Sequence, residues 1–178
     1  LGLLGLFSTQ YLKLCGALNV IVSDLNPARR ELALNLGADY AFNPLDKDYI
    51  EKVKAVTGGK GVDSVIEVTG NAAAMTDCLK CTKKFGKVVS LGCTRKLTEI
   101  DFYNDVHRPG IEIIGAHSGA RPALESFPGF WTEMDDCRVT LNYIKKGVLN
   151  FEGIISETHS PNDAHSVYKR LCENTLPV

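Results

Sequence analysis

Leu1-Gly2-Leu3-Leu4-Gly5 is followed by an apolar-periodic run to Gly16 and then by Asn19-Val20-Ile21-Val22-Ser23-Asp24. Apolar residues recur at helical spacing after the second glycine, which predicts a helix over residues 3–17 that Gly16 ends. Residues 19–23 form a nearly continuous apolar run, which is typical of a strand covered on both faces. The stretch therefore predicts a glycine turn, a helix and a buried strand that ends at an acidic residue.

The two glycines have the spacing G-x-x-G, and Asp24 stands 22 positions after Gly2. This is the second half of the G-x-G-x-x-G fingerprint of dinucleotide-binding folds, so we expect its first glycine and first strand to precede the sequence given. Gly2 would let the backbone approach a pyrophosphate, and Gly5 would let the helix pack closely on a strand. The amides of Leu3 and Leu4 would face the anion at the helix N-terminus, where the helix dipole favours negative charge.

Asp24 would accept hydrogen bonds from the two hydroxyls of the adenosine ribose. Its carboxylate would also repel a 2′-phosphate, which favours NAD over NADP. Arg29 follows one helical turn later and offers the alternative of a 2′-phosphate partner. Because Asp24 stands at the strand end itself, we assign Arg29 to the adenine or ribose edge. A methyltransferase uses a similar glycine turn and acidic residue, and it is the main competing class on this stretch alone.

Beyond Asp24 the sequence alternates helical and strand patterns. Helices are predicted over residues 27–36, 49–56 and 72–83. Strands are predicted over residues 38–42, 62–68, 86–91 and 111–114. The strands end in small-residue loops such as Thr69-Gly70-Asn71 and Gly92-Cys93-Thr94. This alternation predicts an α/β fold with a doubly wound parallel sheet, which binds ligands at the carboxyl ends of its strands.

The pattern changes after Ser118. Residues 119–130 are rich in Gly, Pro and Ser and predict an irregular loop, and residues 132–146 predict a helix. Ser160-Pro161 predicts the start of a final helix that runs to about Leu171. Its inward face is predicted to carry Ala164, Val167, Tyr168 and Leu171. We expect both ends of the sequence to be cut, because an apolar strand is expected to follow residues 176–178.

The composition is that of an ordinary globular protein, with 178 residues, 44% of them hydrophobic and 23% charged. The net charge of -1 gives no basis for binding nucleic acid, and no apolar stretch is long enough to span a bilayer. Six cysteines lack the density of a disulfide scaffold and predict free thiols in a reducing cytosol. We therefore expect a cytoplasmic protein without nucleic-acid or membrane partners.

Several segments occur in one fixed order along the chain. They are Leu1-Gly2-Leu3-Leu4-Gly5, Asp24-Leu25-Asn26-Pro27-Ala28-Arg29-Arg30, Leu36-Gly37-Ala38-Asp39, Thr57-Gly58-Gly59-Lys60-Gly61-Val62-Asp63, Val65-Ile66-Glu67-Val68-Thr69-Gly70-Asn71 and Phe85-Gly86-Lys87-Val88-Val89. In this order they resemble the zinc-dependent medium-chain dehydrogenase/reductase family, and within it the alcohol, polyol and threonine dehydrogenases. The resemblance covers essentially the whole chain and is loosest over residues 119–136.

The resemblance implies a six-stranded Rossmann sheet that lacks its first strand here. Residues 1–118 would form the NAD-binding domain, and residues 119–178 would rejoin the catalytic domain of the intact enzyme. The turn at Val68–Gly70 would line the adenosine and pyrophosphate crevice, and the turn at Leu91–Cys93 would run beside the nicotinamide. Ala116 and Ser118 would bind the carboxamide through backbone groups. The predicted cofactor-binding residues are Gly2, Leu3, Leu4, Gly5, Asp24, Arg29, Val68, Thr69, Gly70, Leu91, Gly92, Cys93, Ala116 and Ser118.

By the same resemblance, the intact enzyme would transfer a hydride between a secondary alcohol or polyol and NAD. A zinc ion in a separate N-terminal catalytic domain would polarise the alcohol oxygen. None of the family's metal ligands or catalytic residues maps onto this sequence, so the chain alone is expected to bind cofactor without turnover. Two alternatives stay open: a zinc-independent, quinone-reductase-like oxidoreductase and a stand-alone nucleotide-binding module. Asp24 speaks against the former, since such enzymes usually prefer NADPH.

Other residues invite functional roles. Cys78-x-x-Cys81 has a redox or zinc-like spacing, but it falls in a predicted helix without a second cysteine pair, so we interpret both as helix cysteines. His117 is interpreted as a loop residue that could border the substrate cleft, and Trp131 as a cover for the cleft, a subunit contact or loop packing. By family analogy, residues 96–102 are predicted as an edge strand of a homo-oligomer.

Overall fold

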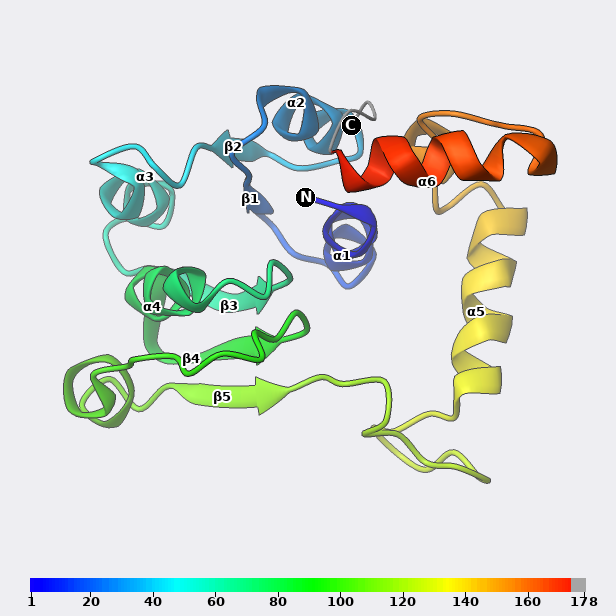
Figure 1. The fold of residues 1–178 in the computed structure, drawn as a ribbon. Coiled ribbons are helices and arrows are strands. Elements are labelled where there is room, and N and C mark those ends of the chain that lie inside the picture. Colours follow the sequence, from blue (N-terminus) through cyan, green and yellow to red (C-terminus); the bar gives the residue numbers. More distant parts are fainter. Residues whose placement is uncertain (174–178) are drawn as a thin grey trace.

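A computed structural model describes residues 1–173 (Figure 1). Within these residues, five strands pair in parallel in two sheets. One sheet pairs β1 (Ile21–Ser23) with β2 (Tyr40–Phe42), and the other has the order β3 (Val62–Glu67), β4 (Thr82–Ser90) and β5 (Glu112–Gly115). In a doubly wound sheet, pairs such as β1-β2 lie on one side of the first strand and runs such as β3-β4-β5 lie on the other side. The predicted α/β class is therefore confirmed.

Helices separate most of the strands, as the alternating pattern predicts. The α-helices are α1 (Leu3–Leu14), α2 (Pro27–Asn35), α3 (Tyr49–Val56), α4 (Ala72–Cys81), α5 (Glu133–Lys145) and α6 (Ala164–Cys172). Three short helices are η1 (Phe102–His107), η2 (Glu152–Ile154) and η3 (Pro161–Asp163).

The helix ends follow from local chemistry. The Asn26 side chain accepts a hydrogen bond from the Ala28 amide at 2.9 Å, and Pro27 occupies the first position of α2. Gly16 and Gly37, just past α1 and α2, have φ angles of 87° and 105°, in the left-handed region that glycine tolerates best.

Three predicted features are wrong. The helix predicted over residues 72–83 ends at Cys81, because Thr82 already pairs with Val62 of β3. The pairing then shifts register, so that Lys87 is the next residue of β4 to face β3. Residues 96–102 form no strand, and their last residue begins η1.

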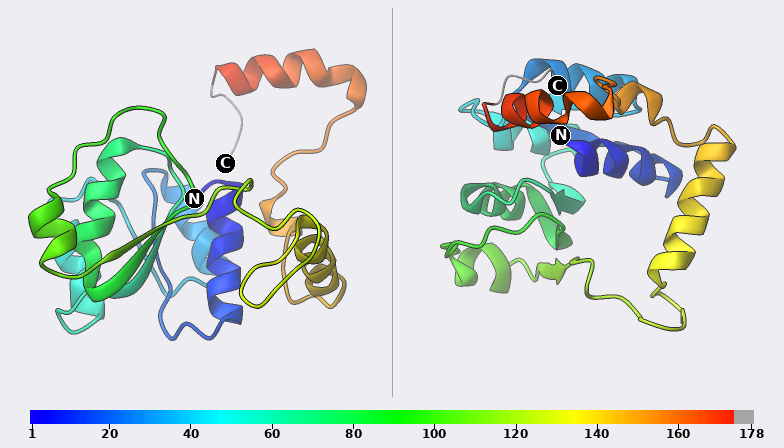
Figure 2. Two further views of the ribbon diagram at one scale, coloured as in Figure 1. Left: turned by 90° about the horizontal axis from the view of Figure 1, so that it is seen from below. Right: turned by 45° about the vertical axis from the view of Figure 1, so that its right-hand side comes forward.

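The third error concerns α6. Tyr168 and Leu171 were predicted to face inward, but they are 69% and 50% exposed. Figure 2 shows α6 standing apart from the rest of the chain in the view from below. Ala164 is exposed as well, and only Val167 of the four predicted residues is half-buried, so the described residues leave most of the apolar face of α6 uncovered. The strand expected after residues 176–178 lies outside the described residues.

Two separate hydrophobic cores correspond to the two sheets. The first joins α1, β1 and α2 through Leu1, Leu6, Val20, Val22, Ala33 and Ala38. The second joins α4, β4 and the start of β5 through Leu79, Val88 and Ile111. Since β1 and β3 share no ladder, contacts around the N-terminus of α1 connect the two halves.

The segment after β5 returns to α1. Residues 119–130 form the predicted irregular loop, and α5 then stands beside α1 (Figure 1). The Tyr11 hydroxyl hydrogen-bonds that of Thr140 at 2.7 Å. The side chain of Gln10 donates to the Asn150 carbonyl at 2.9 Å and accepts from the Asn150 amide at 2.7 Å. Over residues 1–173, no helix is long and apolar enough to cross a membrane.

Candidate functional site

The N-terminus of α1 leaves backbone donors free of helical partners. Gly2 is its N-cap, and the first intrahelical hydrogen bond runs from the Leu6 amide to the Gly2 carbonyl at 3.0 Å. The amides of Leu3 and Leu4 precede that bond, and no described side chain caps this end. A Cβ added at Gly2 would meet nothing within 4 Å. This helix end is therefore open, and the positive end of the α1 dipole favours the binding of an anion there.

Gly5 brings α1 against the end of β3. It is buried, and a Cβ added there would lie 3.3 Å from Cγ2 of Val68 and 3.6 Å from the Leu1 side chain. The predicted close packing of helix on strand is confirmed, and the neighbour is the residue that directly follows β3. The contact places the glycine turn and the first residue of the Val68–Gly70 turn together.

Asp24 follows β1 and lies at the same end of α1. Its carboxylate accepts the Asn26 amide at 2.8 Å and forms an ion pair with the Leu1 ammonium. Burial raises the pKa of Asp24, but the Leu1 ammonium, the Asn26 amide and the charge of Arg29 together hold it below its ordinary value. Asp24 is therefore ionised at neutral pH.

Arg29 borders the glycine turn, and Arg30 has a different role. Arg29 helps line a cavity of about 160 Å³ with Gly2 and Leu3. The guanidinium of Arg30 instead donates to the Asp24 carbonyl at 2.7 Å and fixes the turn after β1. Among the two adjacent arginines, Arg29 is the one that faces the predicted site.

Glu67, the last residue of β3, was not predicted as a site residue. It is only 4% exposed, and its Oε1 accepts the amides of Thr69 at 2.6 Å and Gly70 at 3.1 Å, together with the Thr69 hydroxyl. A carboxylate at the end of a strand, directly after Val65-Ile66 and before Val68-Thr69-Gly70, was the available sequence signal. It marks an ionisable group that needs several donors when buried.

The turns after β3 and β4 touch each other through their backbones. The Glu67 carbonyl accepts the amides of Leu91 at 2.9 Å and Gly92 at 2.7 Å. A Cβ at Gly92 would lie 2.5 Å from the Val68 carbonyl carbon, closer than real side chains approach. Gly70, with a φ of 66°, faces the Cys93 backbone. The glycine turn before α1, the turn after β3 and the turn after β4 therefore lie together.

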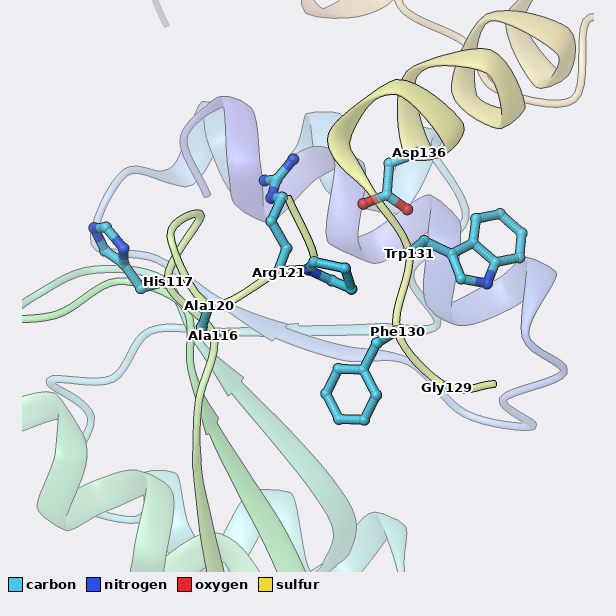
Figure 3. Close-up of a pocket in the computed structure, with 9 residues that line it drawn as sticks. Ala116, His117, Ala120, Arg121, Gly129, Phe130, Trp131 and Asp136 are labelled. Carbon is cyan, nitrogen blue, oxygen red and sulfur yellow. The ribbon is translucent and has the colours of Figure 1, made fainter. Parts of the chain in front are cut away.

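The turn after β5 is connected to β4 and borders a second cavity (Figure 3). The Ala116 amide donates to the Ser90 carbonyl at 3.0 Å. Ala116 and His117 line a cavity of about 430 Å³ whose other walls include Arg121 and Trp131. His117 accepts the Gly119 amide through Nδ1 at 2.9 Å. The side chain of Ser118 is exposed, as is that of Cys93.

Zinc does not fit the described part of the chain. No group of three His, Cys, Asp or Glu residues within residues 1–173 could hold a metal ion. Burial is the main cause that raises the pKa of Cys78 to about 12 and that of Cys81 to about 11, so both thiols of α4 are protonated at neutral pH. The interpretation of both as helix cysteines is confirmed.

Comparison with known proteins identifies the family. The sequence profile described as zinc-binding dehydrogenase matches residues 4–136. The L-threonine 3-dehydrogenase of Pyrococcus horikoshii is 38% identical over 114 residues, which are 64% of this chain and 33% of that protein. The chain thus spans about a third of the length of this curated relative.

Solved structures agree on the fold. A benzyl alcohol dehydrogenase from Acinetobacter calcoaceticus superposes with a TM-score of 0.82 at 21% identity, over 98% of this chain and 45% of that chain. An Escherichia coli enzyme described as a short chain alcohol dehydrogenase, solved with NADH, superposes with a TM-score of 0.78 at 19% identity, over 96% and 46%. Because the family profile matches most of its length, the chain belongs to the zinc-binding dehydrogenase family.

Proposed function

We propose that this chain is the NAD-binding part of a zinc-dependent dehydrogenase that transfers a hydride between a secondary alcohol or polyol and NAD. The observation that carries the proposal is the meeting of the open N-terminus of α1 with the turns after β1 and β3. Gly5 touches Val68, and the Asp24 side chain lies beside Leu1, the residue before Gly2. The names of the dehydrogenase relatives and the NADH complex of one structural neighbour support the same assignment.

The chain's own residues would bind and orient the cofactor. The amides of Leu3 and Leu4 would receive the pyrophosphate, because they lack helical partners and lie at the positive end of the dipole. The ionised Asp24 would accept the ribose hydroxyls, while Arg29 would lie along the adenosine. When bound, NAD supplies the hydride acceptor.

The later turns would form the rest of the crevice. Val68, Thr69 and Gly70 would line its adenosine and pyrophosphate part, and Leu91, Gly92 and Cys93 would border the nicotinamide. Backbone groups of Ala116 and Ser118 would hold the carboxamide and so select the ring face that is offered.

Zinc chemistry belongs, in this proposal, to a catalytic domain outside residues 1–178. Residues 1–118 would be the cofactor domain, and residues 119–178 the segment that rejoins the catalytic domain. The intact enzyme would be a cytoplasmic homo-oligomer. All six cysteines are free, which supports a reducing compartment. The half-exposed Ile113 and Ile114 on the outer strand β5 support an interface there.

Calorimetric titration of the chain with NADH, NADPH and S-adenosylmethionine tests the proposal. We expect binding of NADH, weaker binding of NADPH and none of S-adenosylmethionine, because the Asp24 carboxylate repels a 2′-phosphate. Stronger binding of NADPH would overturn the role of Asp24 and favour the quinone-reductase type. Binding of S-adenosylmethionine alone would reject a dehydrogenase.

A further inference from the structure

One residue outside the predicted cofactor contacts connects two of the three converging turns. Glu67 holds the Thr69-Gly70 turn through its carboxylate and the Leu91-Gly92 turn through its carbonyl. We propose that Glu67 is a positioning residue that fixes both turns in the arrangement that receives the dinucleotide. This inference rests on the proposed function and adds to it a residue that need not touch the cofactor.

The hydrogen-bond pattern explains how Glu67 acts. The amides of Thr69 and Gly70 and the Thr69 hydroxyl all converge on one carboxylate oxygen, Oε1. Successive amides that point into one concavity form an anion-binding nest, and here the chain's own carboxylate fills it. These donors are consumed internally, so the Thr69 and Gly70 amides are not available to bind the dinucleotide. The Thr69 hydroxyl in turn accepts the Asn71 amide at 3.0 Å, which leads into the first turn of α4.

The backbone of Glu67 transmits the same constraint to β4. Its carbonyl accepts both Leu91 and Gly92, and Gly92 has no room for a side chain against the Val68 carbonyl. Movement of the first turn would therefore displace the second turn, which the proposed function assigns to the nicotinamide. Because Val68 also contacts Gly5, the displacement would reach the pyrophosphate end as well.

Substitutions at Glu67 and Thr69 remove different numbers of the hydrogen bonds that hold the turn. Glu67→Gln keeps the volume and one accepting oxygen, but it replaces the other oxygen with a donor that faces the Gly70 amide at 3.4 Å. Glu67→Ala leaves all the converging donors unsatisfied. Thr69→Val removes one donor and leaves Glu67 in place. Glu112→Gln is the matched control, because Glu112 is an exposed strand carboxylate paired with Lys87 outside the crevice.

The experiment measures NADH affinity by calorimetry and NADH position by energy transfer from Trp131, the single tryptophan of the chain. Thermal midpoints report folding separately. We expect Glu67→Gln to raise the Kd for NADH about tenfold and to change the transfer efficiency at saturation, with a midpoint close to that of the wild type. Glu67→Ala should bind more weakly still, Thr69→Val should show a smaller loss, and Glu112→Gln should match the wild type.

The outcomes distinguish this inference from the proposed function. The positioning role would be overturned if the wild-type chain binds NADH and if both Glu67→Gln and Thr69→Val keep its NADH affinity and its energy-transfer efficiency. Failure of the wild-type chain to bind NADH would instead reject the proposed function. If Glu67→Gln does not fold, Glu67→Asp decides the question, because it keeps the charge, leaves Thr69 intact and withdraws the carboxylate from the Thr69 and Gly70 amides. Weakened NADH binding by folded Glu67→Asp would then support the positioning role, and wild-type affinity would overturn it.

Discussion

At the residue scale, two glycines of the site are required for different physical reasons. A Cβ at Gly2 meets no protein atom, so Gly2→Ala should cost less than about 1 kcal/mol of folding free energy as a change of N-cap. It should nevertheless raise the Kd for NADH about tenfold or more, because the methyl group would occupy the space of the pyrophosphate. Urea unfolding and NADH titration measure the two effects. Unchanged affinity would contradict pyrophosphate binding at this turn.

Gly92→Ala is the matched comparison. Its Cβ would clash with the Val68 and Gly70 backbones at 2.5 to 2.9 Å, so the turns must separate. We expect a loss of roughly 1–3 kcal/mol of stability together with weaker NADH binding. A stable variant with wild-type affinity would show that the two turns do not depend on their contact.

Asp24 sets the choice of cofactor in our proposal. Asp24→Asn should lower the affinity for NADH about tenfold and leave that for NADPH equal or higher, because the repulsion of a 2′-phosphate disappears. Asp63→Asn serves as the control, since Asp63 is an exposed carboxylate at the opposite end of β3. Parallel titrations with both cofactors measure the ratio. A retained preference for NADH in Asp24→Asn would refute the assigned role.

Sequence patterns predicted the site residues unevenly. Gly5 was predicted to bring the helix close to a strand and Asp24 to end a strand, and the structure places both there, because the spacing of a glycine turn and a strand-end carboxylate is a local property. Glu67 was missed because its importance arises from donors in the following turn and from the next strand, which no local spacing reveals. Its carboxylate becomes conspicuous only once burial is known.

At the element scale, local signals predicted the presence of helices well, but they predicted poorly where a helix ends next to a strand. The predicted bounds of α3 match the structure, since the pattern and the following glycines agree. Those of α4 and β4 differ because strand pairing at Thr82 overrides the helical pattern. For α6, periodicity predicts which side chains share a face, but burial depends on a partner surface that the pattern cannot supply.

The cysteines of α4 give a test at this scale. The pKa of Cys78 is raised to about 12 and that of Cys81 to about 11, chiefly by burial, so both thiols stay protonated at neutral pH. We expect slow alkylation by iodoacetamide at these two positions and fast alkylation at the exposed Cys15, Cys137 and Cys172. Peptide mass spectrometry over time measures the rates, with the urea-unfolded chain as the control. Equal rates in the folded chain would contradict the packing of α4.

The same shifts predict the direction of the alkaline response. A thiol in the unfolded chain ionises near the ordinary value of 9.0, whereas the folded thiols hold their protons to higher pH. The unfolded state therefore binds fewer protons above pH 9.0, and folding stability falls as the pH rises through this window. Replacing both cysteines with alanine or serine should flatten that dependence in urea titrations at alkaline pH.

At the scale of the whole molecule, the two cores explain why cofactor binding and folding should be coupled. Each sheet packs its own cluster, and the contact of Gly5 in α1 with Val68 after β3 lies where the halves meet. A ligand that bridges the α1 N-terminus and the turns after β1 and β3 would bind across this junction. Its binding would stabilise the folded state in proportion to the logarithm of its concentration.

Metal dependence separates the chain from the intact enzyme that we propose. No metal-ligand cluster exists among residues 1–173, so a chelator should change neither the thermal midpoint nor the NADH affinity of the chain. The chain should also produce no NADH from secondary alcohols, because the group that polarises the alcohol oxygen lies in the proposed catalytic domain. In a longer form that carries that domain, the chelator should abolish turnover and spare NADH binding. Turnover by the chain alone, or loss of NADH binding on chelation, would refute the assignment of cofactor binding to this chain and of metal chemistry to the proposed catalytic domain.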